Sequence, residues 1–409
     1  MRDLLFLAHR IPYPPEKGEK IRAWHEFLAL ARTHRMHLGC FIDDPADLAH
    51  VPALKAQCAD LAAFRLHPRR QRLRALLRAR PGRPLSLDYF ADRRMAAWVA
   101  AKRAQGIDRA FVYCSAMAPY VMGEPGLYRV LDMVDVDSAK WAGYAAGATW
   151  PMGTVWAREA RTLLGFERRA AADFDHTLFV SQDERAAFVA VVPEAATRCL
   201  AFDNGVDAER FAPDPGIASP YAPGGPAVVF TGTMDYRPNI EAVVWFASSL
   251  LPRLQAGRPD LRFAVVGANP ARAVRRLAAR PGVIVTGRVA DVRPWLAHAA
   301  LAVAPLRLAR GIQNKVLEAM AMARPVIATP QAFAGIDATA GRDLLVADGD
   351  AGFAAAVEAV LDGRHPGLGA AARSAVLRRY AWSATLAGLA DAMTPPGETT
   401  QAPVPEVTA

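Results

Sequence analysis

The sequence predicts an α/β protein built from two Rossmann-like domains. Its 409 residues exceed what one hydrophobic core usually supports, so two domains are the first expectation. Short apolar runs alternate with longer segments of helical period, which is the pattern of strand–helix units that form parallel sheets covered on both faces. The pattern breaks once, at residues 203–226, where Asn204-Gly205 and five prolines gather as in a linker, and then it restarts.

In the first half, five short apolar runs are expected to form the strands of one parallel sheet. They lie at residues 3–7, 37–41, 109–113, 129–133 and 176–180. Segments of helical period fill the gaps, notably 21–33 and 156–173. We therefore expect residues 1–205 to fold as the N-terminal Rossmann-like domain.

After the linker, five further runs predict a second sheet of the same kind. They lie at residues 227–230, 262–266, 283–286, 301–304 and 326–328. We expect residues 206–377 to form this second Rossmann-like domain and a last helix, 378–393, to cross back and pack on the first. Residues 394–409 are rich in Pro, Thr and Glu and are predicted to be disordered.

Composition limits the class of protein. Four cysteines are scattered without ligand spacing, which argues against a zinc site and against a disulfide framework, and favours a reducing compartment. The first apolar run, residues 4–8, is too short for the core of a signal peptide or for a membrane span. We expect a cytoplasmic protein whose net charge of +9 leaves open an association with an anionic membrane surface.

The most informative segment is 304–329, which reads as strand, loop, helix, turn and strand. A helix that opens just after Gly311 would present free backbone N–H groups and the positive end of its dipole to a phosphate. Lys315 would add a full charge in the first turn, and it is one of only six lysines among 49 basic residues. Glu318, one turn further, suits the hydroxyls of a ribose. The helix start also contains Ile312, Gln313 and Asn314.

A second phosphate-binding loop is predicted where the pattern restarts. Gly232 directly follows the strand at 227–230, where a residue without a side chain lets a diphosphate approach the backbone. Arg237, five residues on, could bind the same group. Two further strands end on glycine, at Gly267 and at Gly287, although an ordinary strand-to-helix turn explains each of them equally well.

The run 304–329 resembles the donor-binding signature of the retaining GT-B glycosyltransferases of family 4. This resemblance implies two Rossmann-like domains that face a cleft and a nucleotide-diphosphate sugar as co-substrate, with no other cofactor and no metal. Lys315 would then lie on the diphosphate and Glu318 on the ribose. The sequence departs from the family pattern at Arg310, where a glutamate that touches the donor sugar is usual, so the identity of the sugar stays open.

The resemblance also assigns the glycine loops. Gly232 with Arg237 would form the family's other phosphate-binding loop, and Gly267, Gly287 and Val289 would seat the nucleobase. In the first domain, which would bind the acceptor, a glycine loop between strand and helix would border both the diphosphate and the acceptor. Its residues here are Lys17, Gly18, Glu19 and Lys20.

Asp135 is the predicted catalytic residue of the first domain. It lies near the carboxyl end of a strand, where ligands bind in open α/β sheets, and could position or deprotonate an acceptor hydroxyl. Lys315 and Arg237 would stabilise the charge that grows on the diphosphate. Asp135 and Asp137 also form the DxD spacing of metal-dependent transferases, which is an alternative. For Asp137 alone, we expect a helix cap.

The motifs at 17–24, 132–141 and 230–239 together resemble a bacterial subgroup, the sugar transferases associated with exosortase and PEP-CTERM systems. This resemblance implies a role in exopolysaccharide or cell-surface glycan synthesis, on a saccharide or lipid-linked acceptor. It runs from residue 1 to about residue 393.

A basic stretch extends from Arg65 to Arg83, with eight arginines and no acid. A cationic amphipathic helix of this kind could lie on anionic lipid, and a merely solvated helix face is an equally good interpretation. Nucleic acid is not an expected partner, because no aromatic platform accompanies the charge.

Three functions remain open at this point: a metal-independent glycosyltransferase that retains anomeric configuration, a metal-dependent DxD transferase, and a non-catalytic nucleotide-sugar-binding protein. Sensitivity to a chelator separates the first two, and release of nucleotide diphosphate separates both from the third.

Overall fold

The computed structural model describes residues 1–15, 18–77, 80, 82–309 and 312–398. By its internal contacts the chain divides into two compact units. Unit 1 consists of Met1–Asn204 together with Thr385–Ala409, and unit 2 of Gly205–Ala384. The sequence predicts the first boundary after residue 205 and the return of the chain at residue 378.

Unit 1 is built on a seven-stranded sheet in the order β3-β2-β1-β4-β5-β6-β7, in which every neighbouring pair is parallel. The strands are β1 (Arg2–Ala8), β2 (His34–Ile42), β3 (Asp60–Arg65), β4 (Arg109–Tyr113), β5 (Tyr128–Val134), β6 (His176–Phe179) and β7 (Cys199–Ala201). Central β1 and β4 are continuous apolar runs buried on both faces, as parallel strands covered by helices require.

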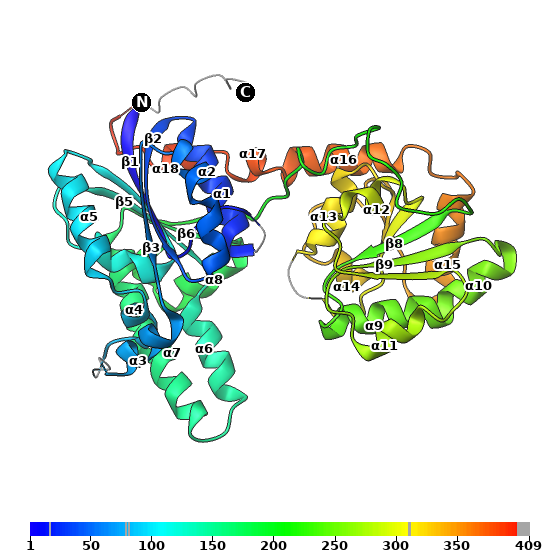
Figure 1. The fold of residues 1–409 in the computed structure, drawn as a ribbon, viewed down its shortest axis with the longest axis horizontal. Helices are drawn as coiled ribbons and strands as arrows, with labels where there is room; N and C mark the ends of the chain where they lie inside the picture. The colour runs from blue at the N-terminus through cyan, green and yellow to red at the C-terminus, as the bar shows by residue number, and fades with distance from the viewer. Residues whose placement is uncertain (16–17, 78–79, 81, 310–311, 399–409) are drawn as a thin grey trace. The chain divides into compact units, whose positions relative to one another are not determined.

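The helices of unit 1 connect these strands and cover the sheet (Figure 1). They are α1 (Gly18–Ala31), α2 (Val51–Ala56), α3 (Pro68–Leu77), α4 (Leu85–Tyr89), α5 (Arg93–Ala104), α6 (Asp137–Ala146), α7 (Met152–Asp173) and α8 (Gln182–Val191), with short 3-10 turns η1 (Pro45–His50), η2 (Ser115–Tyr120) and η3 (Pro193–Ala195).

Unit 2 contains a six-stranded parallel sheet in the order β10-β9-β8-β11-β12-β13. Its strands are β8 (Ala227–Thr231), β9 (Arg262–Val266), β10 (Val283–Gly287), β11 (Leu301–Ala304), β12 (Val326–Ala328) and β13 (Leu345–Val346). Its helices are α9 (Arg237–Trp245), continued by a π-helical turn η4 (Phe246–Leu250), then α10 (Leu251–Gly257), α11 (Arg272–Leu277), α12 (Arg293–Ala297), α13 (Asn314–Ala321), α14 (Pro330–Phe333), α15 (Gly349–Leu361) and α16 (Leu368–Arg379). In Figure 1, α9 and α11 cover one face of this sheet and α13 and α16 the other.

Three strands were missed by the sequence analysis, and all three are short or half-exposed. β3 lies at the edge of its sheet, so only part of it is buried and its apolar run is broken. β7 has three residues and β13 has two, which is too short for a periodicity to show. The other ten strands lie where the sequence placed them.

The two expected sheets therefore exist, each with its own hydrophobic core. Because the strands of each sheet are parallel, their carboxyl ends share one edge. In unit 1 this edge carries the loops after β1, β4 and β5, and in unit 2 the loops after β8, β9 and β11.

The end of the chain returns to unit 1. Along the chain, α17 (Trp382–Thr385) spans the boundary from unit 2 to unit 1, and α18 (Leu389–Ala392) then packs on α1. Tyr128 on β5 donates its hydroxyl hydrogen to the Ala392 carbonyl at 3.2 Å, and Arg109 on β4 donates to the Met393 carbonyl at 3.3 Å. Of the predicted return helix 378–393, residues 378–384 belong to unit 2 and the part from Thr385 belongs to unit 1, and the segment is divided into α17 and α18 instead of forming one helix.

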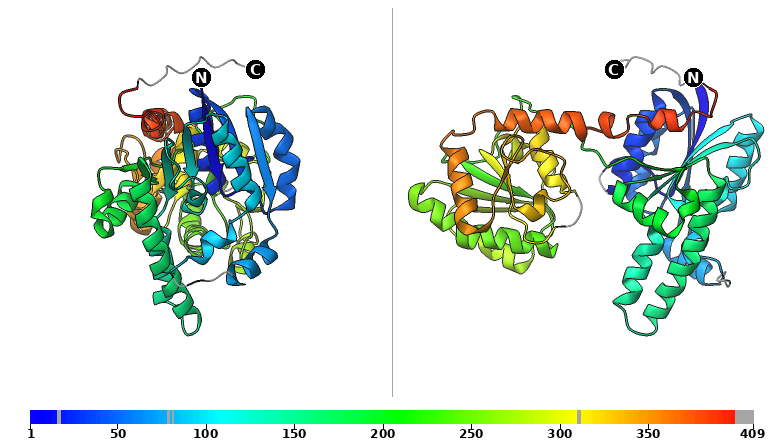
Figure 2. Two further views of the ribbon diagram at one scale, coloured as in Figure 1. Left: turned by 90° about the vertical axis from the view of Figure 1, so that its left-hand side faces the viewer. Right: turned by 180° about the vertical axis from the view of Figure 1, so that it is seen from behind.

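A helical hairpin, α6 with α7, projects from the sheet of unit 1, as all views in Figures 1 and 2 show. Three rings pack along it: Trp141, Tyr144 and Trp156, with centroids 5.9 to 6.5 Å apart. Trp150 lies in the turn of the hairpin and is 84 % exposed.

Candidate active site

The loops after β8 and β9 in unit 2 lie in direct backbone contact. Gly232 donates its N–H to the Val266 carbonyl at 3.1 Å, and Met234 donates to the Ala268 carbonyl at 2.8 Å. Gly232 and Gly267 have φ values of 155° and 153°, a conformation that residues with a side chain rarely adopt. A Cβ atom on Gly267 would collide with the Gly232 carbonyl group. The structure thus brings together two glycines that the sequence singled out separately.

Lys315 lies against the first of these loops. It stands in the first turn of α13, and a Cβ on Gly232 would lie 3.4 Å from its Cε. Its ammonium donates to the Asn239 side-chain oxygen at 3.0 Å and lies 5.3 Å from the centre of the Phe230 ring. Strand β8, helix α9 and helix α13 therefore hold one positive charge at the carboxyl edge of the sheet.

Burial tunes the charges of this helix. It lowers the pKa of the Lys315 ammonium to about 8, against the opposing attraction of Glu318. Burial also raises the pKa of the Glu318 carboxyl to about 7, while the positive charges of Lys315 and Arg210 act in the other direction. Two ionisable groups one helical turn apart are thus poised near neutral pH, which is typical of functional sites.

Asn239 is a residue whose role the sequence analysis missed. It is 3 % exposed, and its amide nitrogen donates to the Thr233 carbonyl at 2.8 Å while its oxygen accepts from Lys315. It thereby ties the loop after β8 to Lys315. The signal available in the sequence was a Pro-Asn pair at a helix start seven residues after Gly232, which is too common a turn to assign a role.

Arg237, predicted to hold the same diphosphate, points elsewhere in this structure. Its side chain is 85 % exposed and pairs with Glu241 on the next turn of α9 at 2.7 Å. The residue that reaches Lys315 from α9 is Asn239 instead. The expected contact of Arg237 with a diphosphate therefore stays a prediction, and it requires this exposed ion pair to open.

The remaining donor-site predictions lie around α13 and β10. Gln313 is the residue before α13 and its side-chain oxygen is 3.5 Å from the Lys315 ammonium. Asn314 opens the helix, and Ile312 packs on the core of unit 2. Gly287 ends β10 with φ of 70°, and Val289 packs on the same core. Gly311 and Arg310 lie outside the described residues.

In unit 1, Asp135 lies in a strained loop at the end of β5. Val134, a β-branched residue, has φ of 68°, which is costly for such a side chain. The loop is held from beneath by Asp132, which accepts the Val134 N–H at 2.8 Å and an Arg22 hydrogen bond at 2.6 Å. Glu184 of α8 accepts the Val136 N–H at 2.9 Å. The surrounding protein fixes the backbone around Asp135.

Lys140 of α6 is the partner of both aspartates in this loop. It donates to Asp135 at 2.6 Å and to Asp137 at 3.4 Å. Burial opposes its charged form, but the hydrogen bond of Asp135 and the charges of both aspartates raise its pKa. Asp135 is therefore held beside the ammonium of Lys140. Lys140 lies on α6, which starts two residues after Asp135.

The expected cap at Asp137 is wrong. Asp137 is the first residue of α6 rather than the residue before it, and no side chain caps this helix among the described residues. Its carboxylate faces Lys140 instead, and burial raises its pKa. No cluster of three or more His, Cys, Asp or Glu side chains suited to a metal ion occurs in the described part of the chain.

Comparison with known proteins identifies the chain. Residues 225–363, which include the Gly232 loop, Lys315 and Glu318, match the family model of the glycosyl transferases group 1. The GDP-mannose-dependent α-(1-6)-phosphatidylinositol monomannoside mannosyltransferase of Mycolicibacterium smegmatis is 31 % identical over 266 residues, 59 % of this chain and 67 % of that protein. The chain belongs to the glycosyl transferases group 1 family.

Solved structures confirm the GT-B fold of this glycosyltransferase. HepE of Anabaena in complex with UDP matches with a TM-score of 0.58 and 16 % identity, over 95 % of this chain and 98 % of that one. Sucrose-phosphate synthase of Thermosynechococcus elongatus matches with a TM-score of 0.58 and 18 % identity, over 96 % and 98 %. At such identities the likeness concerns the fold alone.

The predicted acceptor loop of the glycosyltransferase is only partly described. Lys17 lies outside the described residues, and Gly18 opens α1 with free space around its Cα. Glu19 pairs with Arg10 at 2.6 Å. Lys20 is buried in an ion pair with Asp47 at 2.7 Å, so its ammonium supports the fold in this structure instead of facing a ligand. Contact of Lys20 with a diphosphate stays a prediction that this conformation does not supply.

His9 of the glycosyltransferase is a second residue that the sequence analysis passed over. It directly follows β1, and its ring stacks on Tyr113 at 5.8 Å and meets Phe90 edge-on at 5.5 Å. Burial lowers its pKa to about 4, so the imidazole is neutral at physiological pH. The sequence gives no signal for this position, because a lone histidine after an apolar run looks the same as an ordinary histidine of the core.

Proposed function

We propose that this glycosyltransferase moves a sugar from a nucleotide-diphosphate sugar to a saccharide or lipid-linked acceptor with retention of anomeric configuration. The observation that carries the proposal is Lys315, whose ammonium is held by Asn239 beside the backbone of Gly232. Gly232 and Gly267 let the loops after β8 and β9 pack backbone against backbone beside Lys315. The relative from Mycolicibacterium smegmatis is named for GDP-mannose, and HepE was solved with UDP, which supports a nucleotide-linked donor.

Charge on the diphosphate grows as the glycosidic bond breaks. A cation already fixed near it stabilises that charge more in the transition state than in the ground state, which raises the rate. Lys315 supplies this charge in our proposal. Arg237 supplies a second one, since its exposed pair with Glu241 contributes little to stability and can open when a stronger anion arrives. Glu318 then binds the ribose hydroxyls.

The acceptor binds to unit 1 in this proposal, and Asp135 positions its hydroxyl. The strained backbone at Val134 and the braces from Asp132 and Glu184 support this assignment, because strain that the surrounding structure maintains gathers at functional sites. The leaving phosphate takes the proton of the acceptor hydroxyl, and Lys315 and Arg237 stabilise the negative charge of the diphosphate in place of a metal. We expect turnover to be unchanged by a chelator; loss of activity with EDTA, restored by a divalent metal, would favour the DxD alternative instead.

We further propose a role in exopolysaccharide or other cell-surface glycan synthesis, at the inner face of the cytoplasmic membrane. Among the described residues, no helix has the length and apolar character to cross a bilayer. Two features support a peripheral contact with anionic lipid. The stretch Arg65–Arg83 has many exposed arginines, and the exposed Trp150 lies on the hairpin whose Arg158 donates to the carbonyls of Arg80 and Arg83.

The test of the proposal is removal of the Lys315 charge. Lys315→Ala is expected to lower turnover by roughly 100-fold or more if the ammonium acts on the leaving group. Nucleotide diphosphate released from candidate nucleotide sugars, with a membrane extract as acceptor, is the measurement. Arg276→Ala, which removes an exposed cation of α11 in the same unit, is the matched control.

Two outcomes would contradict the proposal. Near-normal turnover of Lys315→Ala would remove the leaving-group role. Tight binding of a nucleotide sugar by the wild-type protein, without any turnover in the presence of the extract, would favour the non-catalytic sugar-binding protein.

A further inference from the structure

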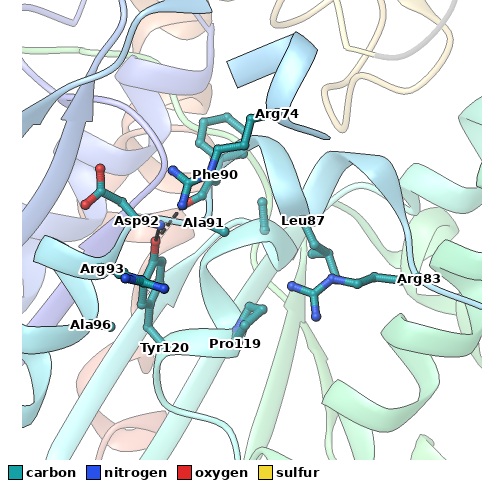
Figure 3. Close-up of a pocket in the computed structure, with 11 residues that line it drawn as sticks. Arg74, Arg83, Leu87, Phe90, Ala91, Asp92, Arg93, Ala96, Pro119 and Tyr120 are labelled. Carbon is teal, nitrogen blue, oxygen red and sulfur yellow. Dashed lines mark hydrogen bonds between the residues drawn. The ribbon is translucent and has the colours of Figure 1, made fainter. Parts of the chain in front are cut away.

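Two adjoining hollows on unit 1 are lined by arginines, and neither involves the residues assigned so far to the reaction. The first, of about 240 Å³, lies between α3, α4, α5 and η2 (Figure 3). Arg74, Arg83 and Arg93 line it together with an apolar wall that includes Phe90. The second, of about 400 Å³, shares Arg74 and Arg93 and adds Arg65, Arg70 and Arg94.

The charge around these hollows is unbalanced. Among the described residues, six arginines line them and Asp92 is the only carboxylate that does so. Asp92 is already engaged, because it accepts the Arg94 N–H at 2.8 Å at the start of α5 and pairs with the Arg94 guanidinium at 2.7 Å. Arg83 pairs with Asp88 at 2.9 Å. Within the described part of the chain, no acid forms an ion pair with Arg74 or Arg93.

The walls are fixed before any ligand arrives. The Tyr120 hydroxyl donates to the Phe90 carbonyl and accepts the Asp92 N–H at 2.8 Å, as the dashed lines of Figure 3 show. Glu159 of α7 accepts the N–H groups of Leu85 and Ser86, each at 2.9 Å, and so anchors the start of α4. A site whose backbone is already ordered loses less free energy on binding.

Both hollows lie near the carboxyl edge of the sheet, where ligands bind in sheets of this kind. Arg65 ends β3 and η2 follows β4, so both hollows adjoin the carboxyl ends of strands. Phe90, part of the wall, touches the ring of His9 directly after β1. The first hollow is smaller than the roughly 300–1,000 Å³ of usual small-molecule sites, so it suits a compact charged group.

We propose that this arginine pocket binds the phosphate or diphosphate group of a phosphorylated acceptor. Guanidinium groups bind phosphate oxygens through paired N–H donors, and Arg74 and Arg93 have such donors to spare. The apolar wall with Phe90 faces the part of the acceptor next to the phosphate. The proposal deepens the proposed function, since it assigns the acceptor to the class of phosphate-linked glycans or lipids.

The first experiment uses inorganic pyrophosphate without metal and measures the rise in Tm that it causes. Pyrophosphate could also bind at Lys315, so each variant is made on the Lys315→Ala background. There, pyrophosphate is expected to stabilise the protein, and Arg74→Ala with Arg93→Ala is expected to weaken its binding roughly 10- to 100-fold. The control is Arg69→Ala with Arg72→Ala. These two exposed arginines lie on α3, as Arg74 does, but line neither hollow.

The second experiment distinguishes a lipid headgroup from a soluble phosphate. Binding is measured to phosphatidylcholine vesicles that contain phosphatidic acid, a phosphate monoester, or phosphatidylglycerol, a diester. The pocket pair, Arg74→Ala with Arg93→Ala, is expected to lose the preference for phosphatidic acid. The control pair, Arg69→Ala with Arg72→Ala, is expected to weaken binding to both lipids alike. An unchanged pyrophosphate effect in the pocket pair, or equal losses in both pairs, would overturn the proposal in favour of a diffuse basic surface.

The two proposals can fail separately. If Lys315→Ala keeps full turnover, the leaving-group assignment falls while the pyrophosphate result still decides the pocket. In the wild-type background, the pocket pair is expected to keep its affinity for the nucleotide sugar and to raise the KM for a phosphorylated acceptor roughly 10-fold or more. A raised KM for the donor instead would contradict the pocket's assignment to the acceptor.

Discussion

At the level of single residues, Lys315 and Glu318 are two ionisable groups of α13 whose pKa values are both shifted toward neutral pH. One turn of α13 separates a cation whose pKa is lowered to about 8 from a carboxyl whose pKa is raised to about 7, and burial is the main cause of both changes. The charge of each group is thus most sensitive to pH between about pH 7 and pH 8. Asn239 and Gly232 fix the position of the ammonium, so pH changes its charge rather than its place.

Affinity for a nucleotide sugar is therefore expected to pass through a maximum between about pH 7 and pH 8. Below pH 7 Glu318 is protonated and accepts fewer ribose hydrogen bonds; above pH 8 Lys315 loses the charge that attracts the diphosphate. The donor's own diphosphate does not titrate in this range, so a calorimetric titration series reports the protein groups. Once Lys315 alone limits binding, affinity falls up to about 10-fold per pH unit.

Lys315→Arg is the control for the alkaline side, because a guanidinium stays charged. Its affinity should stay level above pH 8, and a parallel decline would show that another group is responsible. The stability of the ligand-free protein changes with pH in the opposite direction to the donor affinity. Since the pKa of Lys315 is lowered by folding, the folded state gains stability as pH rises from about 8 toward the ordinary lysine value of 10.5.

At the level of helices and strands, the sequence predicted those elements that consist of long, buried apolar runs. Ten strands and the helix at Lys315 follow from apolar runs and from one unusual lysine. Side-chain directions did not follow: Arg237 has the right residue type and place, yet it pairs with Glu241. Nor could the sequence show that Gly232 and Gly267 touch, because two strands 30 residues apart bring them together only in the sheet.

For the basic stretch too, the sequence did not show which side chains gather in space. Its arginines predicted either a membrane surface or a solvated helix, whereas the structure gathers Arg74, Arg83 and Arg93 from three segments around one hollow. Arg93 lies ten residues beyond the stretch and was not part of the prediction. Convergence of side chains from α3, from the loop before α4 and from α5 depends on tertiary packing, which periodicity does not report.

The α6–α7 hairpin presents an aromatic side chain to solvent. Trp150 is exposed at its turn, and aromatic side chains favour the interface between lipid and water. Trp150→Ala is expected to weaken binding to vesicles with anionic lipid several-fold in a flotation assay, without a change in Tm, because the side chain packs on little. Trp156→Ala is the contrasting variant: it removes a ring packed on Trp141 and Tyr144 and should lower stability.

An unchanged flotation of the Trp150→Ala protein would leave the hairpin out of the membrane contact. The arginines of residues 65–83 would then have to account for any binding to anionic lipid, and that binding should disappear at high salt.

At the scale of the whole molecule, each unit has its own core, but the chain closes unit 1 only with its last helix. Leu389 of α18 is 1 % exposed, and Arg109 and Tyr128 of the first sheet bind carbonyls at the end of the same helix. Unit 1 is therefore complete only after unit 2 has been synthesised. The residues that we propose to bind the diphosphate and the ribose, Lys315, Arg237 and Glu318, all lie in unit 2.

Leu389→Ala should consequently destabilise unit 1 while the donor site of unit 2 stays intact. Loss of a fully buried leucine costs about 2–5 kcal/mol. In calorimetry, we expect one transition to move to lower temperature and the other to keep its position and its stabilisation by nucleotide sugar. Leu377→Ala on α16, where the side chain is 44 % exposed, should shift neither. If Leu389→Ala abolished donor stabilisation as well, folding of the two units would be coupled, and the return segment would serve both cores at once.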